Sequence, residues 1–327
     1  MAATLTSYGP KGSARGRNAR VIPFGGGKGG VGKTFLVANL AVSLARAGYK
    51  VVAVDADLEG ANLHTCLGMR EPPCSLADFV AQREDDVAKL VLDTPIPHLS
   101  ILAGTHGNAS APQPSQQRRV ELLVALRELK ADFVLIDLGA GTHPAVMDYF
   151  MIGDDGVLVI APEPTSVENA YAFLRAAFYR RLRLAMLSLE GRKLVTLAMD
   201  HGNERGIRTP FDLLREIELV DSEEGARFSE TMRAFRPQLV VNEARTAEDI
   251  RLGFSIRSVC RKYFGIETDY LGYVNHDEAA LQAVRARQPL VLASPRSDAA
   301  IYVERMARKL AHQRFGAPES APTRAVE

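Results

Sequence analysis

The chain has 327 residues, of which 46% are hydrophobic and 24% are charged, and its formal net charge is +1. These proportions are ordinary for a soluble globular protein and exclude a chain that is disordered throughout. The small net charge also excludes a strong overall attraction to nucleic acid or to acidic lipid, so any such contact would need a local patch.

Membrane spans, export signals and metal-binding cysteine patterns are not indicated either. No apolar run approaches the roughly 20 residues that span a bilayer, and the first residues lack the apolar stretch of a signal peptide. The three cysteines, Cys66, Cys74 and Cys260, form no CxxC pair, so neither a disulfide framework nor a zinc site is predicted. We therefore expect a cytoplasmic protein in a reducing compartment.

The two ends of the chain differ from its middle. Residues 1–19 are rich in Gly, Ser, Ala and basic side chains, and residues 316–327 are polar without periodicity. We expect both ends to be disordered tails, with a basic arm that touches a partner as the alternative for the first. One domain is then predicted over residues 20–315.

From Arg20 onward, apolar runs of strand length alternate with helical periodicity. Unbroken apolar runs are typical of parallel strands that are buried on both faces. Strands are expected at 21–24, 51–54, 99–102, 133–136, 157–160, 239–241 and 271–274, and helices at 33–47, 118–130, 167–182, 247–263 and 298–312. The alternation predicts an α/β fold with a doubly wound, mostly parallel sheet flanked by helices. Pro23 is unexpected in the first strand, because proline donates no hydrogen bond to a ladder.

Two segments interrupt this alternation. Residues 106–117 form a polar stretch with two prolines, which predicts a loop. Residues 185–237 are too many for an ordinary connection and show helical patterns near 210–219 and 222–235. We therefore expect a helical insertion between two strands of the sheet.

The segment after the first strand matches the phosphate-binding template G-x-x-x-x-G-K-[ST] over residues 27–34. Its glycines let successive backbone N–H groups turn toward phosphate oxygens, and the helix that follows adds its positive end. Lys33 would reach the β- and γ-phosphates, and the Thr34 hydroxyl would hold Mg²⁺. The predicted ligands of ATP or ADP here are Gly27, Gly29, Gly30, Val31, Gly32, Lys33, Thr34 and Phe35.

Two further loops carry carboxylates directly after strands. Asp55 and Asp57 follow the second strand, and Asp137 follows the run at 133–136. Carboxylates at the carboxyl edge of a parallel sheet face the crevice in which ligands bind. Asp137 has the place of a Walker B acid, which holds a Mg²⁺-bound water, and the glycines behind it would let the loop move with the γ-phosphate. For Asp57, a helix-capping role stays open.

The stretch GGGKGGVGKT resembles the deviant Walker A motif of the MinD and ParA superfamily. The resemblance covers most of residues 20–312, and residues 251–292 look most like the FlhG-like members. It implies an ATPase that forms a homodimer around ATP, in which Lys28 is the catalytic lysine that reaches the partner's nucleotide. A fixed cation near the charge that develops during phosphoryl transfer lowers the barrier. The alternative is a solvated loop lysine.

The same resemblance suggests roles for the other polar residues. It assigns Lys33 and Asp57 to catalysis, with Asp57 orienting the attacking water, and it places Asp55 near the metal together with Thr34 and Asp137. It also implies that Asn242, at the end of the strand at 239–241, bonds the adenine base. Strand-end asparagines also commonly cap helices, so that second reading stays open.

The function implied is a slow, Mg²⁺-dependent switch that dimerises with ATP and positions or assembles a cellular structure, with a protein partner or activator that draws it to a pole or membrane surface. The alternative is a ParA-like partition ATPase whose dimer binds DNA non-specifically, which needs a basic patch. Candidates for that patch, which could equally be a solvated helix face, are Arg175, Arg180, Arg181, Arg183, Arg192 and Lys193. An iron–sulfur relative would need paired cysteines, so no iron–sulfur cluster is expected.

The last expected helix has two faces. Its apolar side chains, Val303, Met306, Ala307 and Leu310, lie opposite Arg305, Arg308 and Lys309. An amphipathic helix of this kind can lie on acidic lipid. We expect instead that it is the final helix of the domain and packs on the sheet.

Overall fold

A single eight-stranded sheet forms the centre of the protein. The computed structural model describes residues 19–106, 114–200 and 202–315, so both expected tails lie outside it except for Ala19. The strand order is β3-β4-β2-β5-β1-β6-β7-β8. All neighbouring strands pair in parallel except β3 and β4. The predicted α/β class with a mostly parallel sheet is confirmed.

All seven expected strands are present, and several run into the polar residues that follow them. The strands are β1 (Arg20–Gly25), β2 (Val51–Asp55), β3 (Leu92–Asp93), β4 (Leu99–Leu102), β5 (Phe133–Asp137), β6 (Val157–Ile160), β7 (Gln238–Ala244) and β8 (Asp269–Asn275). The two-residue β3 was not expected. It is too short to show a hydrophobic period, and it pairs only with β4 at the edge of the sheet.

The long expected helices are also confirmed. They are α1 (Lys33–Arg46), α4 (Gln116–Glu128), α6 (Pro164–Ala185), α10 (Ala247–Val259), which continues as the π-helix η2 (Cys260–Phe264), and α13 (Asp298–Phe315). Short helices were missed, because one or two turns give too few apolar positions to establish a period. These are α2 (Leu63–Cys66), α3 (Leu76–Val80), η1 (Val87–Leu90), α5 (Pro144–Met151), α11 (Glu278–Arg285) and α12 (Leu290–Ala293).

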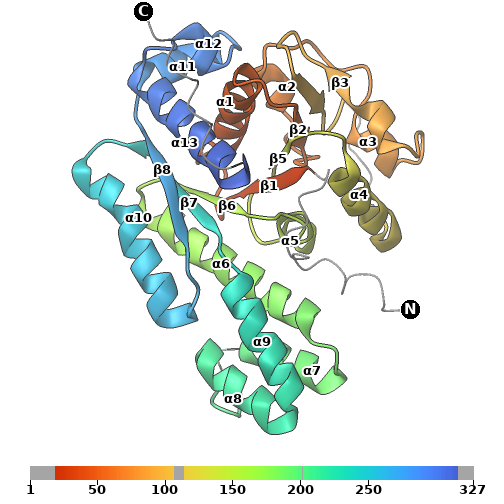
Figure 1. Cartoon of the computed structure of the whole chain (residues 1–327), viewed down its shortest axis with the longest axis vertical. Helices are drawn as coiled ribbons and strands as arrows, with labels where there is room; N and C mark the ends of the chain where they lie inside the picture. Colours follow the sequence, from red (N-terminus) through yellow and green to blue (C-terminus); the bar gives the residue numbers. More distant parts are fainter. Residues whose placement is uncertain (1–18, 107–113, 201, 316–327) are drawn as a thin grey trace, which may run out of the picture.

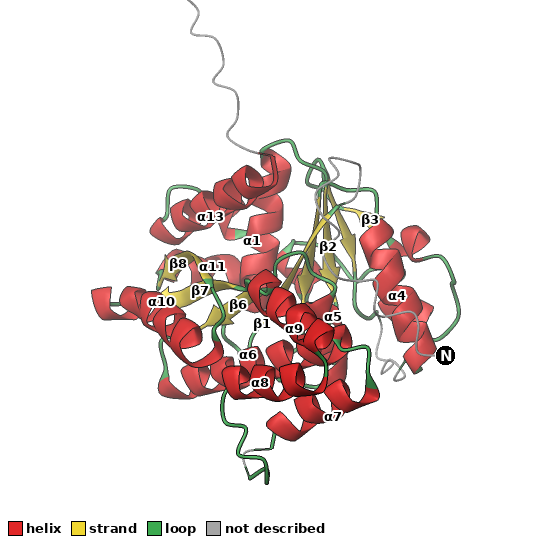
Figure 2. Cartoon of the chain, turned by 60° about the horizontal axis from the view of Figure 1, so that its bottom comes forward, coloured by secondary structure: helices red, strands yellow, loops and turns green. Residues whose placement is uncertain are grey.

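Helices cover both faces of the sheet (Figure 1). The α1 and α13 helices lie together on one face and share a hydrophobic core with the side chains that the strands send to that side. The α4, α5, α6 and α10 helices contribute to a second core on the other face, as the rotated view in Figure 2 also shows. Helix α1 is buried all round from Leu36 to Ala45, because α13 covers the side that the sheet leaves open.

The last helix is part of the domain. Val303, Met306, Ala307 and Leu310 are at most 4% exposed, so the apolar face of α13 is packed in the core and unavailable to lipid. The guanidinium group of Arg20 donates to the carbonyl oxygen of Leu310 at 2.7 Å and anchors the end of the helix. Among the described residues, no helix is long and apolar enough to cross a membrane.

Pro23 fits into β1 because its nitrogen, which has no hydrogen to donate, faces a part of β1 that is not paired with β6. The backbone of Val21 bonds to Asp154 on the β6 side of β1, and Pro23, two residues further, has its nitrogen on that same side. Pairing with β6 begins only at Phe24. The Pro23 ring packs instead against Gly153, where an added Cβ would lie 2.3 Å from its Cδ.

The segment between β6 and β7 is helical, as expected. Its helices are α7 (Leu189–Ala198), α8 (Pro210–Val220) and α9 (Ser222–Ala234), of which α7 was not foreseen. They pack around the end of α6 and lie below it in Figure 1. Phe178 of α6, Leu194, Leu213 and Phe228 are each at most 2% exposed and form the interior of this group, which we call the helical module (α7–α9).

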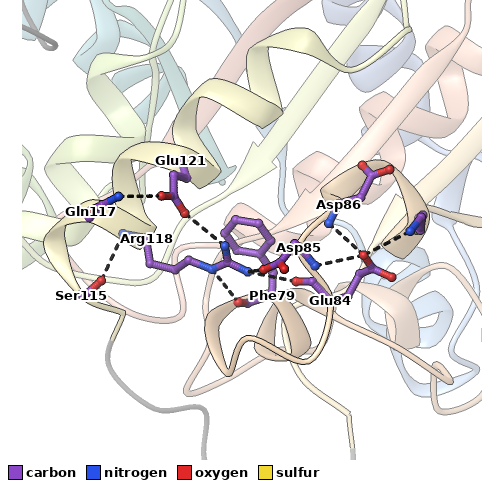
Figure 3. Close-up of polar contacts among 9 residues, drawn as sticks. Phe79, Glu84, Asp85, Asp86, Ser115, Gln117, Arg118 and Glu121 are labelled. Carbon is purple, nitrogen blue, oxygen red and sulfur yellow. Dashed lines mark hydrogen bonds and ion pairs between the residues drawn. The ribbon is translucent and has the colours of Figure 1, made fainter.

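Arg118 fastens the start of α4 to the neighbouring loop (Figure 3). Its guanidinium carbon lies 3.6 Å from the centre of the Phe79 ring, and its nitrogens donate to the carbonyl oxygens of Phe79 and Glu84. Ion pairs to Asp85 and Glu121 complete the contacts. The side chain is only 11% exposed, so this arginine is a structural link rather than a free cation.

Candidate nucleotide-binding site

Three loops meet at the carboxyl edge of the sheet. They are the glycine-rich loop between β1 and α1 and the loops that follow β2 and β5. The N–H of Ala56 donates to the carbonyl oxygen of Asp137 at 2.9 Å, and the N–H of Gly141 donates to that of Gly26 at 3.3 Å. The sequence-predicted phosphate loop and both carboxylate loops therefore form one connected site.

The glycine-rich loop has a conformation that other residues would not tolerate. Gly30 and Gly32 have φ values of +79° and +89°, a region that favours glycine. An added Cβ on Gly27 would lie 2.1 Å from the carbonyl oxygen of Asn169, and one on Gly32 would lie 2.2 Å from Nδ2 of Asn242. The loop is thus held tightly between α6 and the end of β7.

Helix α1 begins at this loop without a competing anion. Gly32 is its N-cap, no side chain in the described ranges caps it, and its first turn contains no acidic residue. The first N–H groups of such a helix need partners, and the helix dipole favours negative charge there. A phosphate group meets both requirements. The half-buried Phe35 packs against the core, and its backbone N–H belongs to the first turn of α1.

Asn242 lies against the loop rather than apart from it. Its Nδ2 donates to the carbonyl oxygen of Val31 at 2.9 Å, and the residue is 4% exposed. The amide therefore braces the phosphate loop from the end of β7. Its expected contact with an adenine base remains a prediction.

The charged side chains predicted for catalysis and metal binding come together beneath the loop. Lys33 is 8% exposed, and burial lowers its pKa, although Asp137 and Asp57 oppose this. Burial raises the pKa of Asp137 to about 8, and neighbouring Asp55 adds to the shift. The Thr34 hydroxyl bonds to the Asp137 carboxylate and acts in the opposite direction. The four charged residues, Lys33, Asp55, Asp57 and Asp137, form the floor of the site.

The Asp137 carboxylate suits a divalent cation. Its Oδ1 is buried and accepts no hydrogen bond from the described residues. Hard cations such as Mg²⁺ prefer oxygen ligands and keep waters that need acceptors. No three His, Cys, Asp or Glu side chains in the described part of the chain could hold a metal by themselves. The Thr34 hydroxyl and the Asp137 carboxylate therefore fit Mg²⁺ that is held jointly with nucleotide phosphates.

The two aspartates after β2 have different surroundings. Asp55 is 1% exposed and accepts from the N–H groups of Asp57 at 3.2 Å and Leu63 at 3.0 Å. Burial raises the pKa of Asp55 to about 6, against the effect of these bonds. Asp57 is less buried and lies between Gly60 and Gly139. A Cβ added to either glycine would come within 3.5 Å of the Asp57 carboxylate. Asp57 therefore contacts both carboxylate loops.

Among the described residues, Lys28 bonds to the start of α6 and to none of the three aspartates of the site. Its Nζ is 2.8 Å from Oε2 of Glu163 and 3.3 Å from Oγ1 of Thr165, at the start of α6. The side chains of Lys28 and Glu163 are 42% and 58% exposed. Within one chain, the structure brings together Lys33, Thr34, Asp55, Asp57 and Asp137 and leaves Lys28 outside.

Sequence reasoning missed residues that support the site by packing. An added Cβ on Gly25 would lie 2.4 Å from the Phe173 ring, so α6 packs directly under the loop. Cys66 lies near Asp55 and Asp137, and burial first, then these carboxylates, raise the pKa of its thiol to about 11. The glycines signalled a close approach, but nothing local showed which helix makes it.

A family model for the CobQ/CobB/MinD/ParA nucleotide binding domain matches residues 22–289. The chain belongs to this family. It is 26% identical over 294 residues to the antiactivator FleN of Pseudomonas aeruginosa, which covers 89% of this chain and 86% of FleN. It is 34% identical to the septum site-determining protein MinD of Synechocystis, over 46% of this chain and 56% of that protein. It is 29% identical to the flagellum site-determining protein YlxH of Helicobacter pylori, over 48% of this chain and 53% of YlxH.

Solved structures show the same fold. MinD of Pyrococcus horikoshii, complexed with Mg-ADP, matches with a TM-score of 0.61 at 21% identity, over 91% of this chain and all of that one. A ParA family ATPase from Chlorobium tepidum matches with a TM-score of 0.57 at 18% identity, over 89% of this chain and 98% of that one. The resemblance to the MinD and ParA superfamily is thus confirmed, and the FlhG-like relatives FleN and YlxH are among the similar proteins.

Proposed function

We propose that the protein is a Mg²⁺-dependent ATPase that switches between a nucleotide-free or ADP form and an ATP-bound homodimer. The position of Lys28 carries this proposal. The remaining charged residues of the site lie together in one chain, whereas Lys28 is held by Glu163 outside it. If the catalytic lysine came from a partner subunit, each single chain would hold every charged residue of the site except that lysine, and this is the arrangement observed. Hydrolysis is then slow in the monomer and depends on dimerisation.

Within each subunit, the residues have separate tasks. The N–H groups of the loop and of α1 bind the phosphates, and Lys33 neutralises their charge. Mg²⁺ held by Thr34 and Asp137 would polarise the phosphate oxygens. Asp57, which contacts both carboxylate loops, orients the attacking water. Lys28 of the second subunit stabilises the charge that develops on the transferred phosphoryl group.

The names of the similar proteins support a role in positioning. FleN is an antiactivator, and YlxH and MinD are site-determining proteins for the flagellum and the septum. We therefore propose that the ATP-bound dimer positions or assembles a cellular structure from the cytoplasm. A protein partner or activator would recruit it to a pole or membrane surface.

Non-specific DNA binding receives less support from the structure. Most cations of the candidate patch already have partners: Arg180 pairs with Asp148, Lys193 pairs with Glu190, and Arg192 donates to the carbonyl oxygen of Met186. Arg181 lies over the Phe235 ring, and burial lowers its pKa. DNA binding requires cations that are free to replace counterions at phosphates, so the run is not an open basic patch.

Light scattering with ADP and with ATP at fixed salt tests the switch. We expect a dimer with ATP only, which lasts longer in Asp57→Ala because hydrolysis is slowed, and which is lost in Lys28→Ala. Lys50→Ala is the matched control, since this exposed lysine lies outside the site. A mass that does not respond to nucleotide would contradict the proposal.

A further inference from the structure

The helical module exposes large apolar side chains at one corner. Leu187 and Leu189, where α6 turns into α7, are 55% and 70% exposed, and Leu219 and Val220, where α8 turns into α9, are 82% and 51% exposed. We call these four residues the apolar corner. Single exposed apolar residues are common on protein surfaces, but here two turns that contact each other through Glu224 each expose a pair of them.

Glu224 joins the two turns. Its Oε1 accepts from the N–H groups of Leu187 and Ser188, both at 2.7 Å, and its Oε2 accepts from the Ser188 hydroxyl at 2.8 Å. Glu224 is 3% exposed, and an added Cβ on Gly191 would lie 2.1 Å from its Oε2. The apolar corner is therefore presented on a fixed framework, which lowers the entropy that binding would cost.

Acidic side chains without an ion pair in the described ranges border the α8–α9 side of the corner. Within the described residues, Glu218, Asp221 and Glu223 form no ion pair, and all three are exposed. They directly flank Leu219 and Val220 in the chain. Glu190 beside Leu189 is balanced by Lys193, 3.7 Å away. Of the nearby cations, Arg227 is engaged by Glu224 at 3.9 Å and Arg192 by the carbonyl oxygen of Met186. The border on the α8–α9 side therefore presents three exposed carboxylates that have no ion pair in the part of the chain that the structure describes.

We propose that the apolar corner docks a basic amphipathic helix of a partner protein. Apolar side chains of such a helix would cover the four exposed residues, and its Lys or Arg side chains would face Glu218, Asp221 and Glu223. The border repels acidic lipid and DNA. A second copy of this chain would bring the same negative charges together, so self-association through this surface is disfavoured. Docking here requires neither nucleotide nor the ATP-bound dimer, so it is independent of the switch.

A labelled 15-residue peptide of leucine and lysine, arranged as an amphipathic helix, is a suitable probe for the full-length protein. Fluorescence anisotropy should show saturable binding that weakens with salt, whereas the corresponding leucine and glutamate peptide should not bind. The double variant Leu219→Ser, Val220→Ser should weaken binding at least tenfold. Leu292→Ser, which removes a 45% exposed leucine on α12, should leave binding within twofold.

Charge reversal tests the border separately from the apolar contact. Glu218→Lys with Glu223→Lys should reduce binding of the lysine peptide at least tenfold and allow the glutamate peptide to bind. Unchanged melting temperature and ATP binding in each variant show that the fold persists. Equal binding of the lysine peptide to the wild type and to both double variants would overturn the proposal. So would binding to phosphatidylglycerol vesicles, or self-association, that depends on Leu219 and Val220.

Discussion

The Nζ of Lys28 lies 2.8 Å from Oε2 of Glu163, so the lysine that the proposed switch supplies to a partner is held by its own chain. Both side chains are about half exposed, which leaves the pair accessible to a second subunit. Dimerisation must then exchange this ion pair for a contact with the partner's nucleotide. The pair is therefore expected to oppose dimerisation weakly.

The first prediction concerns this ion pair. In Glu163→Gln the ATP-bound dimer should form at lower protein concentration, because Lys28 no longer leaves a carboxylate. Exposed ion pairs contribute about 0.2–1 kcal/mol each, and the dimer exchanges two of them, so we expect the dimer dissociation constant to fall roughly two- to thirtyfold. Sedimentation equilibrium with ATP measures it. The matched control is Glu168→Gln, an exposed glutamate one turn further along α6. A weaker dimer in Glu163→Gln would show that Glu163 favours association instead.

The second prediction concerns pH and Asp137. Its pKa is raised from 3.8 to about 8 in the folded, nucleotide-free protein, chiefly by burial. The folded state therefore holds this proton more tightly than the unfolded state does. That contribution to stability is complete below about pH 4 and is lost as the pH rises to about 8. Asp137→Asn removes the titrating carboxyl group and replaces it with an uncharged amide of nearly the same size and shape.

Urea denaturation at about pH 5 and about pH 9 measures the effect. The free energy of unfolding of wild type, relative to Asp137→Asn, should fall by roughly 4 kcal/mol between these values. Asp155→Asn, outside the site, controls for the general effect of removing an aspartate, although it also releases Arg20. A wild-type stability that rises over this range relative to Asp137→Asn would contradict the assignment.

The sequence predicted the sheet and the floor of the site because both depend on local patterns. Apolar runs located seven strands, and the motif at 27–34 with the aspartates after two strands located Lys33, Thr34, Asp55, Asp57 and Asp137. Parallel strands bring their carboxyl ends to one edge, so topology alone gathers these residues. No contact between side chains had to be known.

The supports of the site could not be predicted, because they join distant segments. Lys28 and Glu163 are 135 residues apart, and Asn242 lies 211 residues from Val31. Neither pairing has a local period or spacing. The expectation that α13 packs in the domain is confirmed, but the sequence alone left the membrane alternative open, since the apolar face is the same whether lipid or α1 covers it.

The third prediction separates two roles of Asn242. If its amide braces the phosphate loop through Val31, Asn242→Ala should weaken ATP and GTP binding equally, roughly five- to a hundredfold, because a buried hydrogen bond is worth about 1–3 kcal/mol when one partner is lost. Titration with fluorescent nucleotides measures both. A loss confined to ATP would favour base recognition. Asn203→Ala, which removes a buried amide far from the loop, should leave both affinities unchanged.

The fourth prediction tests whether α13 belongs to the domain. Leu310 is fully buried, so Leu310→Ala should lower the free energy of unfolding by about 2–5 kcal/mol, because it leaves a cavity against α1. Arg308→Ala removes an exposed cation whose ion pair, within the part of the chain that the structure describes, is to Glu304 on its own helix, and it should change stability by less than about 0.5 kcal/mol. If α13 instead lay on acidic lipid, Arg308→Ala would reduce cosedimentation with phosphatidylglycerol vesicles and Leu310→Ala would leave urea stability unchanged.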